Sequence, residues 1–252
     1  MSVKETAEES AIDGVKETGK VILHALILAL IVRVFMYQPF NIPSGSMKDT
    51  LLVGDYLFVS KMSYGYSRYS FPFAPNLFEG RLVGDNPERG DVAVFKLPSD
   101  NETDYIKRVV GLPGDTVQMR NGILFINGKM IPKVRNGSFA TTDYYGRPVN
   151  MPRYTETLPN GVSYQVLDGA PNGAFDNTSL YKVPKGHYFM MGDNRDNSSD
   201  SRVQSSVGFV PLENFVGRAE VLFFSADENW SIFTPWNWPS SIRWSRFFNL
   251  IR

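Results

Sequence analysis

Ser46 is the residue of this 252-residue chain whose surroundings best suit nucleophilic chemistry. It lies in the run Pro43-Ser44-Gly45-Ser46-Met47, directly after the one segment apolar enough to cross a membrane. Gly45 permits a close backbone approach and dihedral angles that suit a tight turn around a nucleophile. A serine needs a base to act as a nucleophile, and without one this run reads as an ordinary Ser/Gly loop. The base has to come from elsewhere in the chain.

Histidine, the usual base for a serine, is nearly absent. The chain has two histidines, His24 in the apolar segment and His187 in a turn that enters a predicted strand. A Ser-His-Asp triad could use only His187, and a zinc site with several histidine ligands cannot be built. The absence of cysteine removes thiol nucleophiles, disulfides and cysteine-based metal sites. The remaining kind of base is a neutral lysine.

Lys107 is the lysine that best fits this requirement. Lysine acts as a base near neutral pH only if burial lowers its pKa of about 10.4, by up to about 3–5 units. Lys107 and Arg108 are neighbours in the strand-like run 104–110, so one of them must point toward an apolar face. Lys96, on another apolar strand, is the rival base. A charge that protects a sheet edge is the alternative for Lys107.

A loop rich in Asx and Ser, GDNRDNSSDSR, occupies residues 192–202. Such side chains form dense local hydrogen bonds. A calcium loop fails on spacing, because counting from Asp193 places Arg195 at a ligand position and Gln204 where a bidentate Glu is needed. We expect Asp200 and Arg202 to join an ion-pair network that orients a neighbouring site, with no bound metal.

The apolar segment at residues 21–36 reads VILHALILALIVRVFM and, with residues 37–40, approaches the roughly 20 residues of a spanning helix. His24 and Arg33 lie near its ends, where polar groups can reach the interface. The preceding tail is long and of mixed charge, and no Ala-x-Ala follows, which argues against a cleaved signal peptide. We predict a tail at residues 1–20 and a transmembrane anchor at residues 21–39. A buried core helix is the alternative.

Residues 40–252 are predicted to be mainly β, an antiparallel catalytic domain. No alternation of strands and helices suggests a parallel sheet. Asn127-Gly128 predicts a hairpin within residues 123–131. Residues 133–185 are polar and rich in turn residues, so we expect short strands at best there, within a β-rich insertion at about residues 120–186. The other strand-like runs are residues 55–60, 91–96, 104–110, 188–191 and 219–224.

All four tryptophans of the chain lie in its C-terminal part, about residues 228–252, with phenylalanines and arginines interleaved. Aromatic and basic side chains together favour a membrane interface, so we predict a membrane-proximal C-terminus. Docking on the domain core is the alternative, and both can hold. The net charge of zero gives no support for a nucleic-acid partner.

These elements, in this order behind an anchor, closely resemble those of bacterial type I signal peptidase (leader peptidase), a Ser-Lys serine protease family. As a set they are highly specific and span residues 40 to about 220. The matching stretches are FNIPSGSM at 40–47, TL at 50–51, GD at 54–55, RGDV at 89–92, DYIKRVVGLPGD at 104–115, MGDNRDNS at 191–198 and DSR at 200–202.

The resemblance implies a role for each matching residue. Ser46 would attack the scissile carbonyl, and buried, deprotonated Lys107 would be the general base. Ser44 would form the oxyanion hole together with the Ser46 backbone amide. Ser198 would hydrogen-bond the lysine and orient it. The residues expected to hold the site together are Gly192, Asp193, Arg195, Asp200 and Arg202. Those expected to bind the substrate are Phe40, Ile42, Met47, Leu51, Leu57, Val94, Asp104, Tyr105 and Ile106.

The resemblance also implies a function: removal of N-terminal signal peptides from exported preproteins, after small residues at positions −3 and −1. The expected partners are signal peptides and the lipid bilayer, with no cofactor, metal or nucleic acid. The chain would cross the inner (cytoplasmic) membrane once, with its N-terminus in the cytoplasm and its catalytic domain on the periplasmic, extracytoplasmic face.

Two departures from the family pattern stand out. Asp49 occupies a position where the family often has proline, which alters the loop after the nucleophile or places a charge near the substrate path. Members with a disulfide and two spans are known, whereas this chain has no cysteine and one candidate span.

Three other functions fit the sequence less well than that of a signal peptidase. A self-cleaving repressor would need a DNA-binding helical module, and a penicillin-binding enzyme would need Ser-x-x-Lys at Ser44 or Ser46, which is absent. A membrane-anchored β-rich binding or assembly module without catalysis is the remaining alternative.

Overall fold

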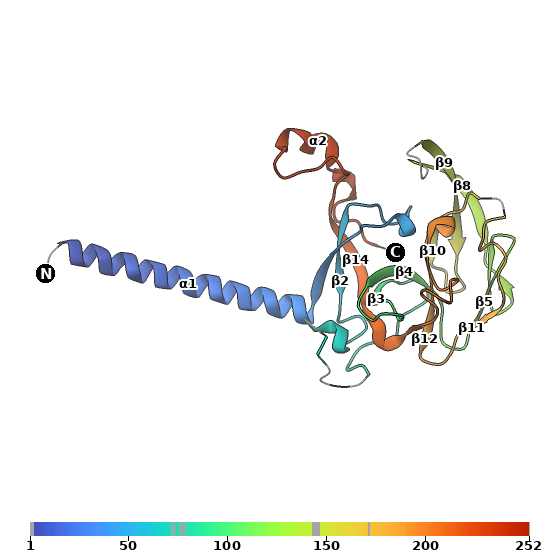
Figure 1. Ribbon diagram of the computed structural model, residues 1–252, viewed down its shortest axis with the longest axis horizontal. Helices are drawn as coiled ribbons and strands as arrows, with labels where there is room; N and C mark the ends of the chain where they lie inside the picture. The colour runs from blue at the N-terminus through green and yellow to red at the C-terminus, as the bar shows by residue number, and fades with distance from the viewer. Residues whose placement is uncertain are drawn as a thin grey trace.

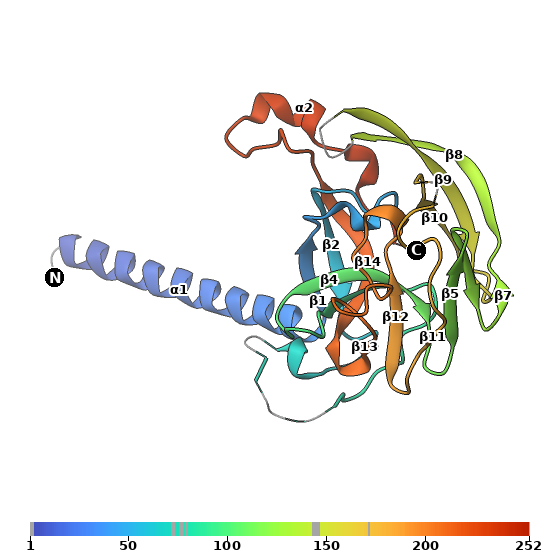
Figure 2. The ribbon, with the colours of Figure 1, turned by 45° about the vertical axis from the view of Figure 1, so that its right-hand side comes forward.

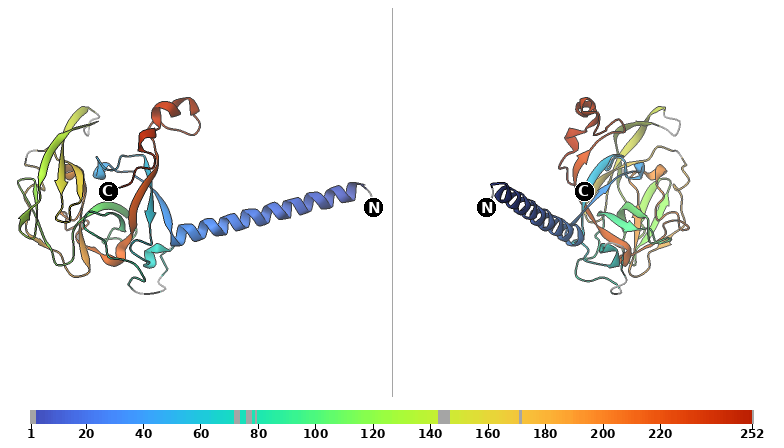
Figure 3. Two further views of the ribbon diagram at one scale, coloured as in Figure 1. Left: turned by 180° about the vertical axis from the view of Figure 1, so that it is seen from behind. Right: turned by 60° about the vertical axis from the view of Figure 1, so that its left-hand side comes forward.

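A single long helix extends away from a β-rich domain in the computed structural model, which describes residues 3–71, 74–75, 78, 80–142, 147–170 and 172–251 (Figure 1). This helix, α1, spans Val3–Phe35, and its segment Gly14–Phe35 is long and apolar enough to cross a membrane. Other parts of the protein cover almost none of that segment, so it is not a buried core helix. Figure 3 shows from two sides that α1 stands clear of the domain.

The ends of α1 do not coincide with those of the predicted tail and anchor. Most of the tail expected at residues 1–20 belongs to α1, which begins at Val3. The anchor was expected to reach residue 39, but the helix ends at Phe35 and Tyr37–Asn41 form strand β1. Pro39 explains the second difference, because a proline disfavours helical backbone at the residue before it, Gln38.

The centre of the domain is a seven-stranded antiparallel sheet with the order β1-β2-β14-β3-β4-β12-β13. The mainly antiparallel β fold expected from the sequence is confirmed. The further strands of this sheet are β2 (Asp55–Ser60), β3 (Val92–Lys96), β4 (Asp104–Gly111), β12 (His187–Met191), β13 (Val210–Pro211) and β14 (Phe215–Ser225).

Strand β4 lies inside this sheet, between β3 and β12. Lys107 pairs with Ala93 of β3 and is buried, so it is not an exposed charge that protects a sheet edge. Successive side chains of β4 pack into different apolar clusters, because side chains alternate across a strand. Ile106 packs with Leu57, whereas Tyr105 packs with Phe95.

Two smaller sheets are built from the chain between β4 and β12. One has the order β11-β5-β6-β7 and contains β5 (Thr116–Arg120), β6 (Ile123–Ile126), β7 (Lys129–Met130) and β11 (Tyr181–Lys182). The predicted hairpin joins β6 to β7, and Asn127 and Gly128 have φ values of 52° and 74°. Both residues are thus in the left-handed region that a two-residue hairpin turn requires.

The other small sheet has the order β10-β9-β8 and contains β8 (Lys133–Thr142), β9 (Pro148–Thr157) and β10 (Ser163–Leu167). Figure 2 shows β8 and β9 as a long curved hairpin on the side of the domain away from α1. The expectation of short strands at best in residues 133–185 is wrong here, because β8 and β9 have ten residues each. Strand propensity depends on context, and cross-strand pairing outweighs the polar composition.

The remaining elements are short helical turns. They are η1 (Gly45–Met47), η2 (Arg68–Ser70), η3 (Arg195–Asn197), η4 (Leu212–Asn214), η5 (Pro235–Asn237), α2 (Trp238–Ser241) and η6 (Trp244–Arg246). The segment with α2 projects from the domain (Figures 1 and 2). Its aromatic residues differ in exposure, and Trp238 is half-buried. Trp230 and Phe247 pack against Phe224, while Phe233, Trp236, Trp244 and Phe248 are exposed.

Candidate active site

The turn η1 presents Ser46, and Ser44 and the 192–202 loop hold it in place. Ser44 caps the turn, since its Oγ accepts a hydrogen bond from the Ser46 amide at 3.2 Å. Asn194 joins the 192–202 loop to the same turn. Its side-chain Nδ2 donates to the Gly45 carbonyl at 3.0 Å, and its backbone amide donates to the Ser46 carbonyl at 3.0 Å. The serine turn and the Asx-rich loop thus form one unit.

The side chains of Ser46 and Lys107 meet beside this unit. Lys107 Nζ donates to Ser46 Oγ at 2.7 Å and to its neighbour's carbonyl, Ile106 O, at 2.9 Å. Ser46 is 6% exposed and Lys107 is 4% exposed. A hydroxyl and an amine are therefore within hydrogen-bond reach of each other in a nearly dry environment. Such a pair can transfer a proton.

The surroundings of Lys107 favour its neutral form. Burial lowers the pKa of Lys107 from 10.5 to about 8, while the carboxylates of Asp200 and Asp193 oppose part of the shift by attracting the charged form. The rival lysine, Lys96, is elsewhere. It forms an ion pair with Asp104 at 2.9 Å and is partly exposed, so Lys107 is the lysine that the fold brings to Ser46.

Arg108, the cation next to Lys107, is also buried, which the sequence argument did not foresee. Asp193 accepts from it twice, at 2.9 Å from Nε and at 2.7 Å from Nη2. Its guanidinium also lies over the ring of Tyr164, 4.1 Å from the centroid. The sequence predicts that one of the two cations points toward an apolar face, and in the structure both side chains are buried. The acidic partner, Asp193, lies 85 residues away in sequence.

Two more buried ion pairs stabilise the Asx-rich loop. Arg202 donates to Asp200 at 2.9 Å from Nε and 2.8 Å from Nη2, which is the pair expected from the sequence. Burial alone would raise the pKa of Asp200, but Arg202 together with hydrogen bonds from Gly192 and Ser198 outweighs it, and the pKa lies below its ordinary value. Arg195 pairs with Glu156 of β9, at 2.6 Å from Nη1. Glu156 is a supporting residue that sequence reasoning missed.

Gly192 is needed here for the space it leaves empty. A Cβ at this position would lie 2.2 Å from Ser198 Oγ and 2.6 Å from the Ser46 carbonyl oxygen. Ser198 is buried, and its side chain lies near enough to the Asp200 carboxylate to help lower the pKa of that group. The hydrogen bond from Ser198 to Lys107 that the resemblance implies is not formed among the described residues. The reason is that Lys107 Nζ is directed to Ser46 Oγ and the Ile106 carbonyl.

The nine residues expected to bind substrate do not all lie together. Seven share one apolar cluster beside η1: Phe40, Ile42, Met47, Leu51, Leu57, Val94 and Ile106. Tyr105 packs in a different cluster, although its ring centroid is 5.2 Å from Lys107 Nζ. Asp104, at the start of β4, is exposed and pairs with Lys96.

The loop that follows the nucleophile contacts the β8–β9 hairpin. Asp49 accepts an ion-pair contact from Arg153 of β9 at 3.1 Å, and Lys48 Nζ donates to Thr141 Oγ1 of β8 at 3.1 Å. The charge at position 49 is thus paired with a residue of the hairpin. The sequence alone did not predict this partner for Asp49.

Three carboxylates, Asp168, Asp176 and Asp196, lie within 4.8 Å of one another in the described part of the chain. Each has a protein donor. Asp168 pairs with Lys133, Asp196 accepts from backbone amides of residues 169 and 170, and Asp176 accepts from that of residue 173. These donors satisfy the carboxylates without requiring an ion.

Comparison with known proteins identifies the family. The model of the family described as signal peptidase, peptidase S26 matches residues 15–224. The chain belongs to this family. It is 42% identical over 241 residues to signal peptidase I of Rickettsia typhi, covering 88% of this chain and 89% of that protein. It is 44% identical over 214 residues to signal peptidase I of Rickettsia akari, covering 81% and 78%.

A solved structure is also similar in sequence. The crystal structure of a signal peptidase I from Enterococcus faecalis V583 is 29% identical, covers 53% of this chain and 97% of that chain, and has a TM-score of 0.31. Family membership and the apolar helix α1 together make the protein a membrane-anchored signal peptidase, a hydrolase. The resemblance noted in the sequence is confirmed.

Proposed function

We propose that this signal peptidase is a serine endopeptidase in which Ser46 is the nucleophile and Lys107 the general base. It removes N-terminal signal peptides from exported preproteins, after small residues at positions −3 and −1. The observation that carries the proposal is the 2.7 Å contact between Ser46 Oγ and Lys107 Nζ. Both groups are buried, and no histidine is needed for the proton transfer.

The first step forms an acyl-enzyme. Neutral Lys107 takes the hydroxyl proton of Ser46 while Ser46 Oγ attacks the scissile carbonyl, and the lysine then passes the proton to the leaving amine. The nearby carboxylates of Asp193 and Asp200 favour the ammonium that exists between these transfers, because both raise the pKa of Lys107. In the second step Lys107 activates a water that hydrolyses the ester.

The oxyanion is stabilised by the turn that carries the nucleophile. The Ser46 amide now donates to Ser44 Oγ, so it already points at an oxygen. When substrate binds, the oxyanion replaces Ser44 Oγ as the acceptor, and the Ser44 hydroxyl rotates to donate as well. Ser198 gives Lys107 a second orienting hydrogen bond once its hydroxyl rotates. Its buried position in the same loop as Asp200 supports this role.

The substrate binds over the apolar cluster beside η1. Met47, Leu51 and Leu57 are fully buried and form its floor, while Phe40 and Ile106 keep accessible surface above them. A shallow apolar site of this kind accepts small side chains. Strand β1 is the end strand of the central sheet, so an extended substrate can pair with its free edge. Tyr105 and Asp104 would contact residues farther along the substrate.

The protein acts in the inner (cytoplasmic) membrane, which α1 crosses once, with its N-terminus in the cytoplasm and the catalytic domain on the extracytoplasmic face. The exposed aromatic side chains near α2 support contact between the C-terminal segment and the same membrane surface. Anchoring enzyme and substrate in one bilayer raises their effective concentration.

The decisive experiment compares two serine variants of the full-length protein. Ser46→Ala should abolish cleavage of a purified preprotein while the thermal unfolding midpoint stays close to wild type. Ser199→Ala is the matched control, because Ser199 is exposed in the neighbouring loop and should retain cleavage. Normal processing by Ser46→Ala would overturn the assignment and favour a binding module without catalysis.

A further inference from the structure

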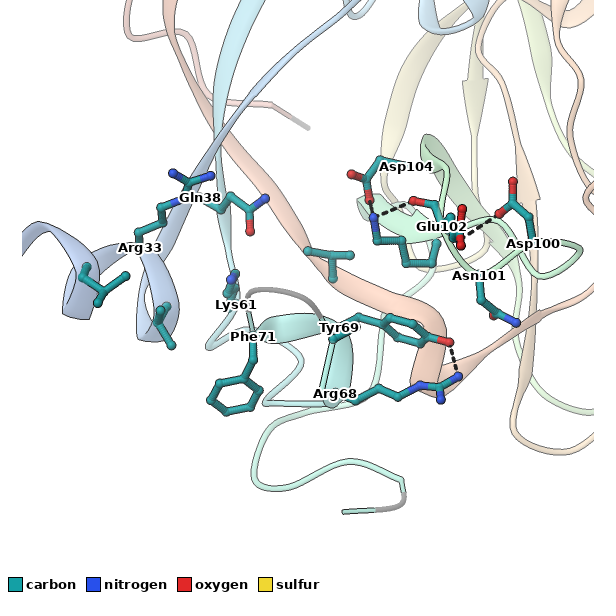
Figure 4. A pocket seen from close by; sticks show the side chains of 15 residues that line it. Arg33, Gln38, Lys61, Arg68, Tyr69, Phe71, Asp100, Asn101, Glu102 and Asp104 are labelled. Carbon is teal, nitrogen blue, oxygen red and sulfur yellow. Dashed lines mark hydrogen bonds and ion pairs between the residues drawn. The ribbon is translucent and has the colours of Figure 1, made fainter. Parts of the chain in front are cut away.

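A cavity of about 740 Å³ lies where α1 enters the β domain (Figure 4). Ser46 and Lys107 do not line it, whereas Asp104, at the start of β4, does. Its lining comes from the last turns of α1, from β1, from Lys61 directly after β2, from η2, and from the β3–β4 connection. A volume of this size is within the range of small-molecule sites.

The charges around this cavity are unevenly paired. On one side, Lys96 forms an ion pair with Asp104 at 2.9 Å, and Asp100 accepts hydrogen bonds from its own loop. Figure 4 shows the carboxylates of Asp100, Glu102 and Asp104 on the side away from α1, and Arg33 and Lys61 on the α1 side. Within the described part of the chain, neither Arg33 nor Lys61 forms an ion pair with a carboxylate.

Lys61 is a buried cation with few partners. It is 3% exposed, and its Nζ donates to one neutral acceptor, the Ser70 carbonyl, at 2.6 Å. An ammonium has three donors, so two remain for another group. Burial lowers the pKa of Lys61 to about 8, and the positive charge of Arg33 adds to that shift. The two cations repel each other on the α1 side of the cavity, away from the lining carboxylates of Asp100, Glu102 and Asp104, and an anion between them would relieve that repulsion.

Aromatic residues place the cavity at the level of a membrane surface. The apolar segment of α1 ends at Phe35, two residues after Arg33. The ring of Phe35 contacts Tyr66 and Phe71 edge-on, with centroids 6.0 and 6.2 Å apart, and the Tyr66 hydroxyl donates to the Phe35 carbonyl at 2.6 Å. Aromatic side chains at the end of an apolar span are typical of the headgroup region.

We propose that this cavity binds the phosphodiester headgroup of an anionic membrane lipid, held between Arg33 and Lys61. Arg68 of η2 also lines the cavity and adds a third cation. The apolar residues Leu30 and Val34 of α1 line it as well and can contact the start of the acyl chains. The bound headgroup would tie the end of α1 to the loop after β2, and so hold the catalytic domain at a set height above the bilayer.

The test uses the delipidated full-length protein in detergent micelles. Dihexanoyl phosphatidylglycerol should bind and raise the thermal unfolding midpoint, whereas dihexanoylglycerol, which lacks the phosphate, should not. Arg33→Gln should weaken phosphatidylglycerol binding about tenfold or more, because it removes a charge-assisted contact. Arg33 is exposed on α1, so this variant is expected to fold even where a Lys61 substitution does not. Lys20→Gln, at an exposed position of the same helix, is the matched control and should bind like wild type.

Two outcomes would overturn the proposal. Equal affinity of wild type and Arg33→Gln for phosphatidylglycerol would show that this cavity is not the site. An equal rise of the unfolding midpoint with inorganic phosphate at the same concentration would show that a free anion, not a lipid, is bound. The readout is independent of cleavage, so a failed assignment of Ser46 and Lys107 would leave it unchanged.

Discussion

Lys107 and Lys61 are both buried, and burial lowers the pKa of each to about 8, yet their surroundings differ. Lys107 has the hydroxyl oxygen of Ser46 at 2.7 Å and two carboxylates nearby that partly oppose the shift. Lys61 has a backbone carbonyl at 2.6 Å and the charge of Arg33, which strengthens the shift. A lowered pKa therefore does not by itself identify a general base. The nucleophile within hydrogen-bond reach does.

The two regions also differ in packing. Around Lys107 the chain is closed, because Gly192 brings the Ser198 side chain and the Ser46 carbonyl so close that no Cβ fits between them. Around Lys61 the fold leaves a cavity of about 740 Å³ open to a ligand. Closed packing suits proton transfer between two fixed groups, and an open cavity suits binding.

The largest expected effect separates the two lysines by activity. Lys107→Met should lower the rate of cleavage of a soluble peptide by about 10²–10⁴-fold, the usual contribution of a general base. Lys61→Met should change that rate by less than about tenfold, since Lys61 is not beside Ser46. Single-turnover kinetics on both purified variants measure the difference. Comparable losses in the two variants would contradict the distinction.

Gly192→Ala tests the closed packing around Lys107. The new methyl group has to displace Ser198 or the Ser46 carbonyl, and overpacking of this kind costs about 1–3 kcal/mol of unfolding free energy. Cleavage should fall as well, because the nucleophile turn moves. Gly19→Ala is the control, since nothing lies within 4 Å of a Cβ there and alanine favours a helix. Urea denaturation measures the unfolding free energy, and peptide cleavage measures the activity. If both were unchanged in Gly192→Ala, the packing around Gly192 would not be tight.

The pH dependence separates the lysines in a second way. The cleavage rate should rise with pH through about 8 as Lys107 loses its proton, and Lys61→Met should keep this rise. Folding stability should also rise with pH, from about 8 toward the unfolded pKa of 10.5, since the folded state binds fewer protons at both lysines. Each lysine-to-methionine substitution should remove part of that stability rise. If the rise of the cleavage rate with pH disappeared in Lys61→Met, Lys107 would not be the general base.

The smallest effect is expected at the partly exposed contact between Asp49 and Arg153. Ion pairs that are accessible to water typically contribute about 0.2–1 kcal/mol. A double-mutant cycle with Asp49→Ala and Arg153→Ala should give a coupling energy in that range that decreases as salt is added. A coupling above about 2 kcal/mol would mean that the hairpin is a structural part of the nucleophile loop.

Much of the fold could be predicted from local patterns. Apolar runs with turn residues between them indicated strands β2, β3, β4, β12 and β14, and Asn127-Gly128 predicted the hairpin between β6 and β7. The ten-residue strands β8 and β9 could not be found in this way. β8 is polar and largely exposed, and β9 is mostly half-buried with a charged residue, Glu156, at its one buried position, so no buried apolar stripe marks either strand. Both are stabilised by pairing with neighbouring strands.

The candidate site was only partly predictable for the same reason. Ser46 and Lys107 could be named because their immediate neighbours restrict what each can do. The partners of Arg108 and Arg195 could not, since Asp193 and Glu156 are 85 and 39 residues away and the pairing depends on how the sheets are stacked. The cavity at Arg33 and Lys61 had no sequence signal, because it exists only where α1 meets the domain.

The amino-acid sequence by itself determined the kinds of groups available: a serine in a glycine-loosened turn, few histidines, no cysteine, an apolar segment and lysines on apolar strands. Tertiary structure decided which lysine meets the serine, which charges are buried in pairs and which cations are left facing a cavity. The physical reason is that reactivity here depends on distance and desolvation. Both are set by contacts between segments far apart in the chain, which local residue patterns do not encode.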